Sequence, residues 1–303
     1  MKKNLLFLLC MCMLSPIWFG AQAQQQPQAP PRFAAPDEPE VSDEVLLELY
    51  DGARVTDVVD AMVTCGYMDV GVMDRNIAPL WRDTETMAHR ISGIALTVRY
   101  GPTNHPKFPE ADLTDPGNVR VYRNWRGMWY HVLSPEPFMD IIKKGTIIVM
   151  DNRDDNDTGT TGSNNIMEWQ KRGAVGLIAA GGVRDIDEVI HQKNPVYMDY
   201  TKRGRGERIG RNEFIDMQQP VVVGGALVYP GDVIVADSDG VVVVPRRVAI
   251  RVGQIAYQEL VADQRGRLRL YEEQGRTIDE SVIIRETPAE FYKRLGLPES
   301  PNR

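Results

Sequence analysis

The sequence predicts an α/β protein in which helices pack against a mixed sheet. Apolar residues at helical spacing alternate along the chain with short runs rich in Val and Ile. Some of these runs are uninterrupted, as in strands buried on both faces, and others are joined by Gly, Pro and Asp turns, as in antiparallel hairpins. Buried runs combined with hairpins indicate a sheet that contains both parallel and antiparallel pairs.

Four segments have the features of helices. The first two have a serine or threonine near the start, acids in the first turn and a glycine at the end. The third starts at Ser163 or Asn164 and ends in Lys-Arg-Gly, which suits the negative end of a helix dipole. The segments are SDEVLLELYDG (42–52), RVTDVVDAMVTCG (54–66), SNNIMEWQKRG (163–173) and a long helix from about 247 to 273.

Strands are expected in the segments rich in branched apolar residues. ISGIALTVRY (91–100) and GTIIVMDN (145–152) are two of them, and the apolar residues before Gly181 form a third. The segment 220–245, PVVVGGALVYPGDVIVADSDGVVVVP, predicts three short strands linked by turns. A doubly wound nucleotide-binding sheet is not expected, because no GxGxxG follows the first strand and VGGALVYPG is not followed by a helix.

The first 23 residues have the plan of a cleavable secretory signal peptide. Two lysines precede an apolar run that is too short and too Pro-interrupted for a membrane span, and AQA at 21–23 supplies small residues for cleavage. A retained membrane anchor and a lipoprotein modified at Cys10 are weaker alternatives. Residues 24–40, rich in Gln, Pro and Ala, predict a disordered linker. The mature protein is therefore expected to be secreted or periplasmic, with no membrane segment after signal cleavage.

Net charge and cysteine content limit the classes of function that fit this sequence. Loss of the signal peptide removes Lys2, Lys3 and two of the three cysteines, so the net charge changes from −7 to −9 and only Cys65 remains. A single cysteine cannot form an internal disulfide. An acidic chain with no basic run longer than KRGRGER argues against a nucleic-acid partner. The remaining length predicts one domain over 41–285 with a C-terminal tail, 286–303.

Four stretches resemble a known family: VTDVVDAM with VMDRNIAPLW, ISGIALTVRY, TGSNNIMEWQKRGAVGLIAAGGVRD, and GGALVYPGDVIVADSDGVVVVPRRVA. They are similar to the RraA-like family, which includes the 4-hydroxy-4-methyl-2-oxoglutarate/4-carboxy-4-hydroxy-2-oxoadipate aldolases and the regulator of ribonuclease E activity A. The resemblance spans roughly residues 52–275. It implies a layered α/β/β/α sandwich with mixed sheets, assembled as a homotrimer or hexamer with active sites between subunits.

The resemblance also implies a site. In the aldolases, a pyruvyl group and a divalent metal lie where a helix starts, opposite an Arg-Asp pair about twenty residues later. Helix N-terminal N–H groups and an arginine fork can hold a carboxylate, and an aspartate can hold Mg²⁺ or Mn²⁺, which stabilises an enolate. Taken alone, the local pattern also fits a surface turn with a helix-capping aspartate. The matching residues are Gly162, Asn164 and Asn165 for substrate binding, Ser163 for catalysis, Arg184 for both, and Asp185 for the metal.

One departure from the family concerns the catalytic base. Ser163 stands where the family has an acid, and a serine hydroxyl cannot accept a proton at neutral pH unless another base activates it. The alternative interpretation of Ser163 is an N-cap. The aldolases also take a glutamate from the C-terminal helix of a neighbouring subunit. Glu259 is the nearest match, although an exposed helix glutamate is the simpler interpretation.

A second departure is an insertion between about 102 and 140. It brings an aromatic and basic cluster that could stack on a sugar or hold a carboxylate, or could form the apolar underside of a long loop. The loop DYTKRGRGERIG (199–210) adds cations whose default interpretation is solvated charge. Asp237 and His89 are expected to be structural, in a turn and without a ligand-spaced partner.

Three functions fit the sequence. The first is a divalent-metal-dependent carbon–carbon lyase on a small 2-oxo acid, acting by aldol cleavage or by oxaloacetate-type decarboxylation. The second is a non-catalytic binding or regulatory protein. The third is an enzyme of the same fold retargeted to an oxidised sugar or sugar acid.

Overall fold

The computed structural model describes residues 41–153 and 157–299. The expected signal peptide (1–23) and linker (24–40) lie outside the described residues. Within these ranges, no helix has the length and apolarity needed to cross a membrane.

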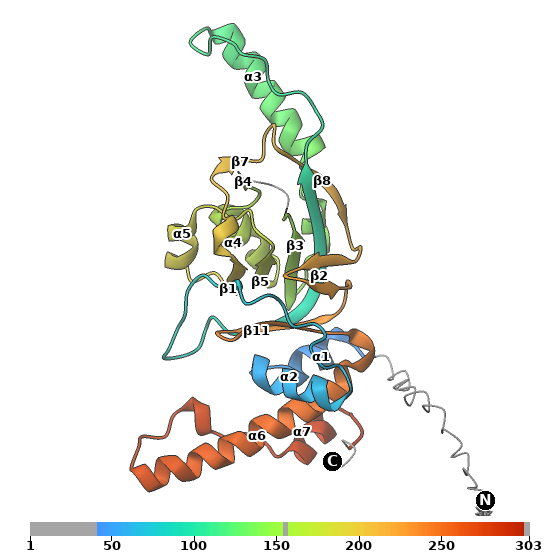
Figure 1. Cartoon of the computed structure of the whole chain (residues 1–303), viewed down its shortest axis with the longest axis vertical. Coiled ribbons are helices and arrows are strands. Elements are labelled where there is room, and N and C mark those ends of the chain that lie inside the picture. Colours follow the sequence, from blue (N-terminus) through green and yellow to red (C-terminus); the bar gives the residue numbers. More distant parts are fainter. Residues whose placement is uncertain (1–40, 154–156, 300–303) are drawn as a thin grey trace, which may run out of the picture. The chain divides into compact units, whose positions relative to one another are not determined.

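An eight-stranded mixed sheet forms the centre of the fold (Figure 1). Its strands are hydrogen-bonded in the order β1-β6-β5-β3-β2-β11-β12, and β8 pairs with the second half of β2. The neighbours β2, β3, β5 and β6 are parallel, and the other pairs are antiparallel, as predicted. The strands are β1 Ile77–Pro79, β2 Ile91–Pro102, β3 Thr146–Asp151, β5 Ala174–Ala179, β6 Val196–Asp199, β8 Asn212–Met217, β11 Val233–Asp237 and β12 Gly240–Val244.

The remaining described strands form two small two-stranded sheets. β9 (Val221–Val223) and β10 (Ala226–Val228) form a hairpin, and β4 (Thr158–Gly159) pairs in parallel with β7 (Gly206–Glu207). The segment 220–245 therefore holds four strands and not the three that were predicted. The reason is a two-residue turn at Gly224-Gly225, where both residues have positive φ (55° and 79°), as tight hairpin turns require.

In residues 41–153 and 157–299, the four predicted helices are present, and three further α-helices accompany them. The helix α2 has Arg54 at its N-cap, although the nearby Thr56 is the residue type that favours this position. The Val55 N–H donates to Oδ2 of Asp237 at 2.9 Å, so the residue that satisfies this helix start lies far away in the sequence. The helices are α1 Asp43–Leu49, α2 Val55–Thr64, α3 Pro116–Met128, α4 Ser163–Lys171, α5 Ile186–His191, α6 Ala249–Gln274 and α7 Pro288–Arg294.

Three apolar clusters hold these elements together. Helices α1, α2, α6 and α7 pack against β11 and β12. The β9–β10 hairpin covers one face of β3 and β5, and α4 and α5 cover the other. Side chains of β3 alternate between the two faces: Ile147 and Val149 meet the hairpin, whereas Ile148 and Met150 meet the helices. The observed layers are therefore helices, a mixed sheet and a small second sheet, and this mixed α/β fold confirms the prediction.

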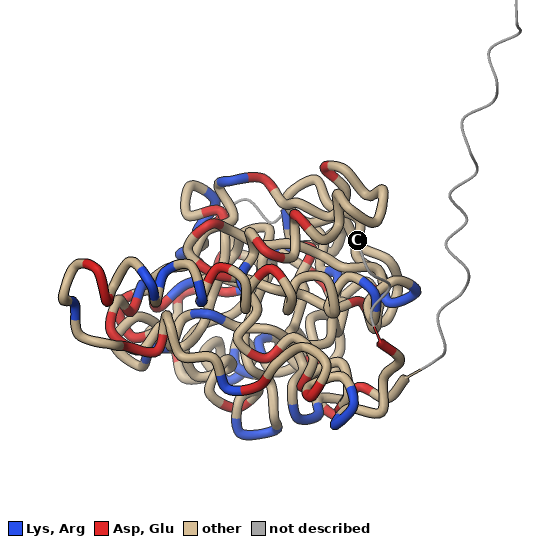
Figure 2. The backbone as a smooth tube through the Cα atoms, turned by 90° about the horizontal axis from the view of Figure 1, so that it is seen from below, with Lys and Arg blue, Asp and Glu red and all other residues tan. Residues whose placement is uncertain are grey.

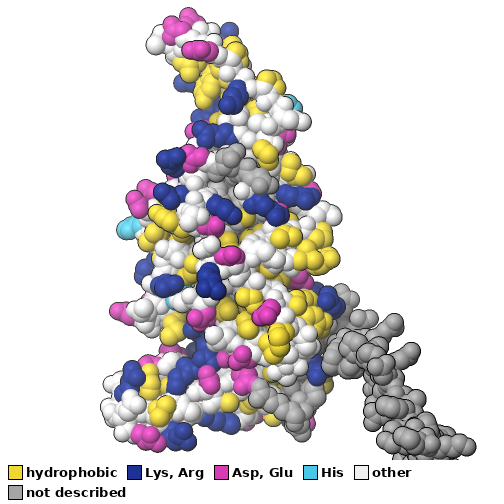
Figure 3. Space-filling view, in the orientation of Figure 1, with side chains coloured by type: hydrophobic (Ala, Val, Ile, Leu, Met, Phe, Trp, Pro, Cys, Tyr) yellow, Lys and Arg dark blue, Asp and Glu magenta, His cyan; other side chains and the backbone are white. Residues whose placement is uncertain are grey.

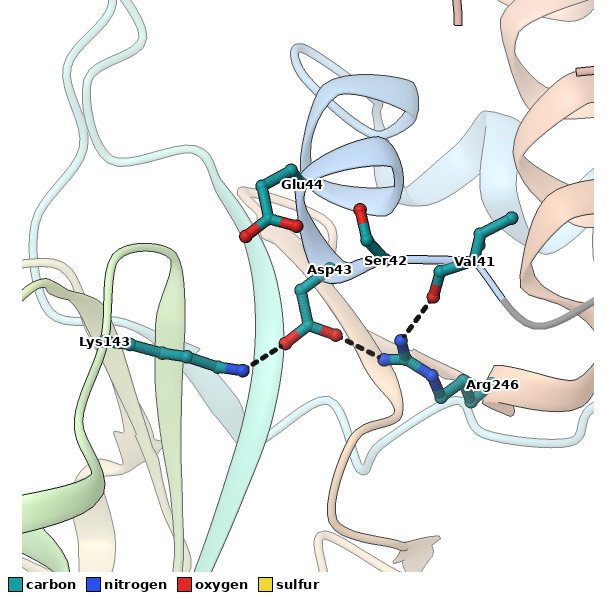
Figure 4. A pocket seen from close by; sticks show the side chains of 6 residues that line it. All are labelled: Val41, Ser42, Asp43, Glu44, Lys143 and Arg246. Atoms are coloured by element: carbon teal, nitrogen blue, oxygen red, sulfur yellow. Dashed lines mark hydrogen bonds and ion pairs between the residues drawn. The ribbon is translucent and has the colours of Figure 1, made fainter. Parts of the chain in front are cut away.

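The start of the described chain is fixed by ion pairs around Asp43 (Figure 4). Its carboxylate accepts hydrogen bonds from Nζ of Lys143 at 2.6 Å and from Arg246 at 2.7 Å, and Arg246 also donates to the Val41 carbonyl at 2.8 Å. Burial alone would raise the pKa of Asp43, but these hydrogen bonds outweigh it and lower that pKa. The contact joins α1 to the segments before β3 and after β12.

The C-terminal segment differs from the predicted tail over 286–303. Residues 288–294 form α7, which begins with a capping box between Thr287 and Glu290. Phe291 and Tyr292 are buried against α6, and the Tyr292 hydroxyl donates to a backbone carbonyl of that helix at 2.5 Å. The folded domain therefore extends beyond residue 285.

Candidate functional site

The candidate site lies between β5 and α5, beside the start of α4. After β5 the chain passes Gly181 and Gly182, and a bridge then pairs Val183 with Thr161. Asn152, which follows β3, holds Gly181 with two hydrogen bonds: Nδ2 donates to its carbonyl (2.8 Å), and its N–H donates to Oδ1 (3.1 Å). The ends of two neighbouring parallel strands therefore fix this turn.

Asp185 occupies the N-cap position of α5, but its carboxylate does not cap that helix. Its backbone is in the left-handed region (φ 58°, ψ 44°), which Asp adopts more readily than most residues. The carboxylate instead reaches α4, where Oδ2 accepts a hydrogen bond from the Ser163 N–H at 3.2 Å. Asp185 therefore stands at the N-cap of α5 in a partly exposed turn, but the prediction that its side chain caps this helix is wrong.

Two glycines leave the space that the Arg-Asp pair fills. A Cβ atom at Gly162 would overlap Oδ2 of Asp185, and a Cβ atom at Gly159 would lie 2.5 Å from Cδ of Arg184. Gly162 has an extended backbone (φ −139°) that any residue can adopt. Glycine is needed there because it lets the Asp185 carboxylate come close to the main chain. A side chain at either position would displace the carboxylate or the guanidinium.

Arg184 and Asp185 are partly exposed and only loosely paired. Nε of Arg184 lies 3.7 Å from Oδ1 of Asp185, and the two side chains are 33% and 37% exposed. The Arg184 N–H donates to the Thr161 carbonyl at 3.0 Å, which anchors the base of the side chain. The backbone of Arg184 is thus anchored, and its partly exposed guanidinium can bind a carboxylate.

The structure brings the predicted residues at the start of α4 together with this pair. Ser163 is the first residue of α4 and is buried, and Gly162 is the N-cap, so the N-cap interpretation of Ser163 is wrong. Asn164 and Asn165 follow, and helix geometry leaves their N–H groups without i−4 partners. These N–H groups carry partial positive charge, which favours an anion beside them.

The donors around Asp185 fit one kind of metal ion. In residues 41–153 and 157–299, no group of three His, Cys, Asp or Glu side chains could hold an ion. Zinc sites need three or four such ligands, whereas Mg²⁺ keeps several waters and binds through one or two carboxylates plus substrate. Gly162 lets the carboxylate approach the start of α4, because a Cβ atom at that position would overlap Oδ2 of Asp185. The residues present therefore suit Mg²⁺ or Mn²⁺ held by Asp185, water and substrate.

The insertion forms helix α3 and a short π-helix, Trp129–Leu133, beyond β8 (Figure 1). The rings of Phe108, Tyr122, Trp125 and Trp129 pack together with centroids 5.2–6.0 Å apart. Trp129 is fully buried, and its Nε1 donates to the Asn212 carbonyl at 3.0 Å. Of the two interpretations of this cluster, the structural one is confirmed for Trp129, which cannot stack on a ligand.

The cations of the loop 199–210 mostly have partners of their own. Arg205 pairs with Asp157, with Nε 3.0 Å from each carboxylate oxygen, and Lys202 lies 3.6 Å from Asp199. The main chain of the loop contacts the site, because the Gly204 N–H donates to the Val183 carbonyl at 3.1 Å. Lys and Arg side chains gather on the face around β4 and β7 (Figure 3), while opposite charges are interspersed along the chain as a whole (Figure 2).

Sequence reasoning missed three residues that shape the site. Gly159 makes room for Arg184, Asn152 clamps the turn, and Glu136 contacts α4 from the insertion. The pattern TGTTG (158–162), with two glycines three residues apart before a helix, could have indicated close backbone approach. No local signal marks Asn152 or Glu136, because their partners are distant in the sequence.

An arginine fork, a single carboxylate and helix N–H groups lie together at this candidate site, and groups of these kinds can bind a small carboxylate or a divalent cation. The chain belongs to the RraA-like family, described as Aldolase/RraA, which its residues 55–243 match. This family includes metal-dependent aldolases and RraA regulators. Its match begins within α2 and ends within β12, so it encloses every residue of the candidate site.

Two curated relatives share part of this sequence. Protein DlpA of Legionella pneumophila is 25% identical over 202 residues, which are 66% of this chain and 27% of DlpA. A provisionally named 4-hydroxy-4-methyl-2-oxoglutarate aldolase of Halalkalibacterium halodurans is 28% identical over 120 residues, 40% of this chain and 56% of that protein. The chain therefore spans well under two thirds of the length of either relative.

Solved structures share the fold. An uncharacterized protein from Pseudomonas syringae superposes with a TM-score of 0.56 at 23% identity, covering 79% of this chain and 98% of that one. Streptomyces coelicolor RraAS2, an unusual member of the RNase ES inhibitor RraA protein family, gives 0.53 at 18% identity, covering 76% and 99%. At these identities the likeness is one of fold.

Proposed function

We propose that this protein is a divalent-metal-dependent lyase that breaks a carbon–carbon bond in a small 2-oxo acid. The observation that carries the proposal is the hydrogen bond from the Ser163 N–H to Oδ2 of Asp185, because it joins the metal-binding carboxylate to the anion-binding start of α4. The partly exposed guanidinium of Arg184 stands beside both. These are the groups that a metal-assisted reaction of an oxo acid requires.

Each group has a distinct role in the proposed reaction. Arg184 binds the substrate carboxylate through its planar fork, and the N–H groups of Asn164 and Asn165 hold the same anion from the helix side. Asp185 would hold Mg²⁺ or Mn²⁺, whose positive charge would favour electron build-up on the 2-oxo group. Gly159 and Gly162 keep this arrangement close-packed.

Ser163 favours decarboxylation over aldol cleavage in this proposal. Retro-aldol cleavage must remove a proton from a substrate hydroxyl, and loss of a general base typically costs about 10²–10⁴-fold. Decarboxylation of a 3-carboxy-2-oxo acid such as oxaloacetate starts from an ionised carboxylate and needs no such base. We therefore expect measurable oxaloacetate decarboxylation and weak cleavage of 4-hydroxy-4-methyl-2-oxoglutarate, and Ser163→Asp should raise the second much more than the first.

The same serine is the observation that favours a second candidate, a non-catalytic binding protein. In that case the site would bind oxo acids or another partner without turning them over. The sugar-acid alternative loses part of its support, since Trp129 of the insertion is buried, whereas Trp125 stays partly exposed. We further propose that the protein is exported and forms a homotrimer or hexamer in which a neighbouring α6, with Glu259 as the candidate, completes the site.

The decisive experiment compares Asp185→Ala with Asp187→Ala, an exposed carboxylate in the first turn of the same helix. Binding of Mn²⁺ and turnover of oxaloacetate should be lost in the first variant and kept in the second, with both folded by circular dichroism. Arg184→Lys should also lose turnover, because an ammonium cannot replace two-point recognition. Wild-type turnover by Asp185→Ala would refute the assignment of this site. A monomer in light scattering at micromolar concentration would refute the shared site.

A further inference from the structure

Glu136, at the end of the insertion, contacts the oxo-acid-binding helix α4 directly. Its Oε1 accepts a hydrogen bond from Nδ2 of Asn165 at 2.7 Å, and its Oε2 accepts one from Nε1 of Trp169 at 3.0 Å. Asn165 and Trp169 are four residues apart, so they lie on one face of the first two turns of α4. A single carboxylate therefore braces both turns from the side.

The brace reaches the N-terminus of the helix. Oδ1 of Asn165 accepts a hydrogen bond from the Gly162 N–H at 3.4 Å, while its Nδ2 is held by Glu136. Asn165 thus links the insertion to the residue that makes room for Asp185. Because the free N–H groups of α4 start here, a change in the orientation of this first turn would move the groups that face the substrate.

The same carboxylate is tied to the other side of the site through Arg208. The two side chains form an ion pair and are 12% (Glu136) and 5% (Arg208) exposed. Arg208 also donates to the Ser134 carbonyl at 2.9 Å and lies over the rings of Tyr100 and Tyr130, 5.7 and 5.6 Å from their centroids. Arg208 follows directly on β7, which pairs with β4 beside Arg184.

We propose that Glu136 is a positioning residue that acts through Asn165, so that the insertion orients the start of α4 for the oxo acid. This inference rests on the proposed function. It assigns the insertion a role in the site that does not require any of its side chains to touch substrate. Burial makes the orientation rigid, since a buried carboxylate with three donors has no equivalent alternative arrangement.

The test avoids breaking the ion pair itself, because a buried arginine left without its partner destabilises a protein strongly. Asn165→Ala and Trp169→Phe each remove one donor to Glu136 and leave Arg208 in place. Trp169 is almost fully buried and packs in the core, so its replacement should lower the melting temperature more. Only Asn165 reaches Gly162, so only its loss should disturb the anion site.

The probe is oxalate, a planar mimic of a 2-oxo carboxylate, titrated calorimetrically into the full chain with Mg²⁺. Asn165→Ala should weaken oxalate binding about tenfold and raise KM more than it lowers kcat, with little change in melting temperature. Trp169→Phe should lower the melting temperature and leave oxalate binding within twofold of wild type. Equal binding by wild type and Asn165→Ala, or losses that follow stability in both variants, would overturn the positioning role. Failure of wild type to bind oxalate at all would overturn the proposed function and this inference with it.

Discussion

The candidate site and the insertion hold similar kinds of side chains but satisfy them differently. In the insertion, Trp129 donates to a backbone carbonyl, Arg126 forms a salt bridge with Glu207, and Glu136 receives three donors. At the site, the Asp185 carboxylate has one backbone donor, and Arg184 stands 3.7 Å from its partner. Sequence alone offered both regions as places to bind a ligand.

The difference shows what distinguishes a binding group from a structural one. Polar groups whose partners are all inside the fold are already compensated for their lost hydration, so a ligand gains little from them. A side chain whose backbone is anchored, but whose polar end has few partners inside the fold, can exchange bound water for a ligand. The two regions are nevertheless connected, because the contact between Glu136 and Asn165 runs from one to the other.

The largest expected effect is on stability, in the insertion. Trp129→Ala should lower the free energy of unfolding by about 3–5 kcal/mol, because it empties a fully buried position and leaves the Asn212 carbonyl without its donor. Urea denaturation measures this change. Val132→Ala, in the same π-helix and 66% exposed, is the matched control and should stay within about 0.5 kcal/mol. Similar losses in both variants would mean that the cluster is not the structural unit described above.

The next effect is on chemistry, at the site. Gly162→Ala should reduce kcat/KM for oxaloacetate with Mg²⁺ about 100-fold. The new methyl group would overlap Oδ2 of Asp185 and push this carboxylate out of position. Gly127→Ala in α3 is the control, because a Cβ atom there meets nothing within 4 Å. That control should keep full activity and gain slightly in stability, as alanine favours a helix. Unchanged activity in Gly162→Ala would contradict the close-packed site.

The smallest effect tests a buried polar group outside both regions. His89 accepts the Asp83 N–H at Nδ1 (3.0 Å), and its Nε2 lies 2.9 Å from Oγ of Ser238, which is the pattern of a neutral ring. Burial, with a smaller contribution from Arg90, lowers the pKa of His89 below its usual 6.5. Protonation therefore favours the unfolded chain, and stability should fall as the pH drops below about 6.5 until the folded-state pKa is reached.

His89→Gln should flatten this slope, because glutamine keeps a donor and an acceptor without titrating. Thermal melts between pH 7.5 and 5 measure it. Oxalate binding, measured at pH 7.5, should be the same in both proteins, since His89 is not part of the site. A slope as steep in the variant as in wild type would place the responsible group elsewhere.

Much of the fold was predictable because it depends on local pattern. The runs of Val and Ile predicted β2, β3 and the strands around 220–245, and the apolar stripes predicted α1, α2, α4 and α6. The fourth strand between 220 and 245 was missed, although the Gly224-Gly225 turn that creates it is visible in the sequence. The sequence does not predict helix α7, because a helix of seven residues is too short to show a repeated apolar stripe.

The sequence by itself predicted the core of the candidate site, since TGSNN and GGVRD are both recognisable and their spacing resembles that of a known family. Only the tertiary structure decided how they are used. It turned the Asp185 carboxylate toward α4, gave the N-cap to Gly162 in place of Ser163, and satisfied the start of α2 with Asp237. The physical reason is that helix starts and charged side chains take whichever donor or acceptor the fold brings near, and these partners come from strands and loops distant in the chain.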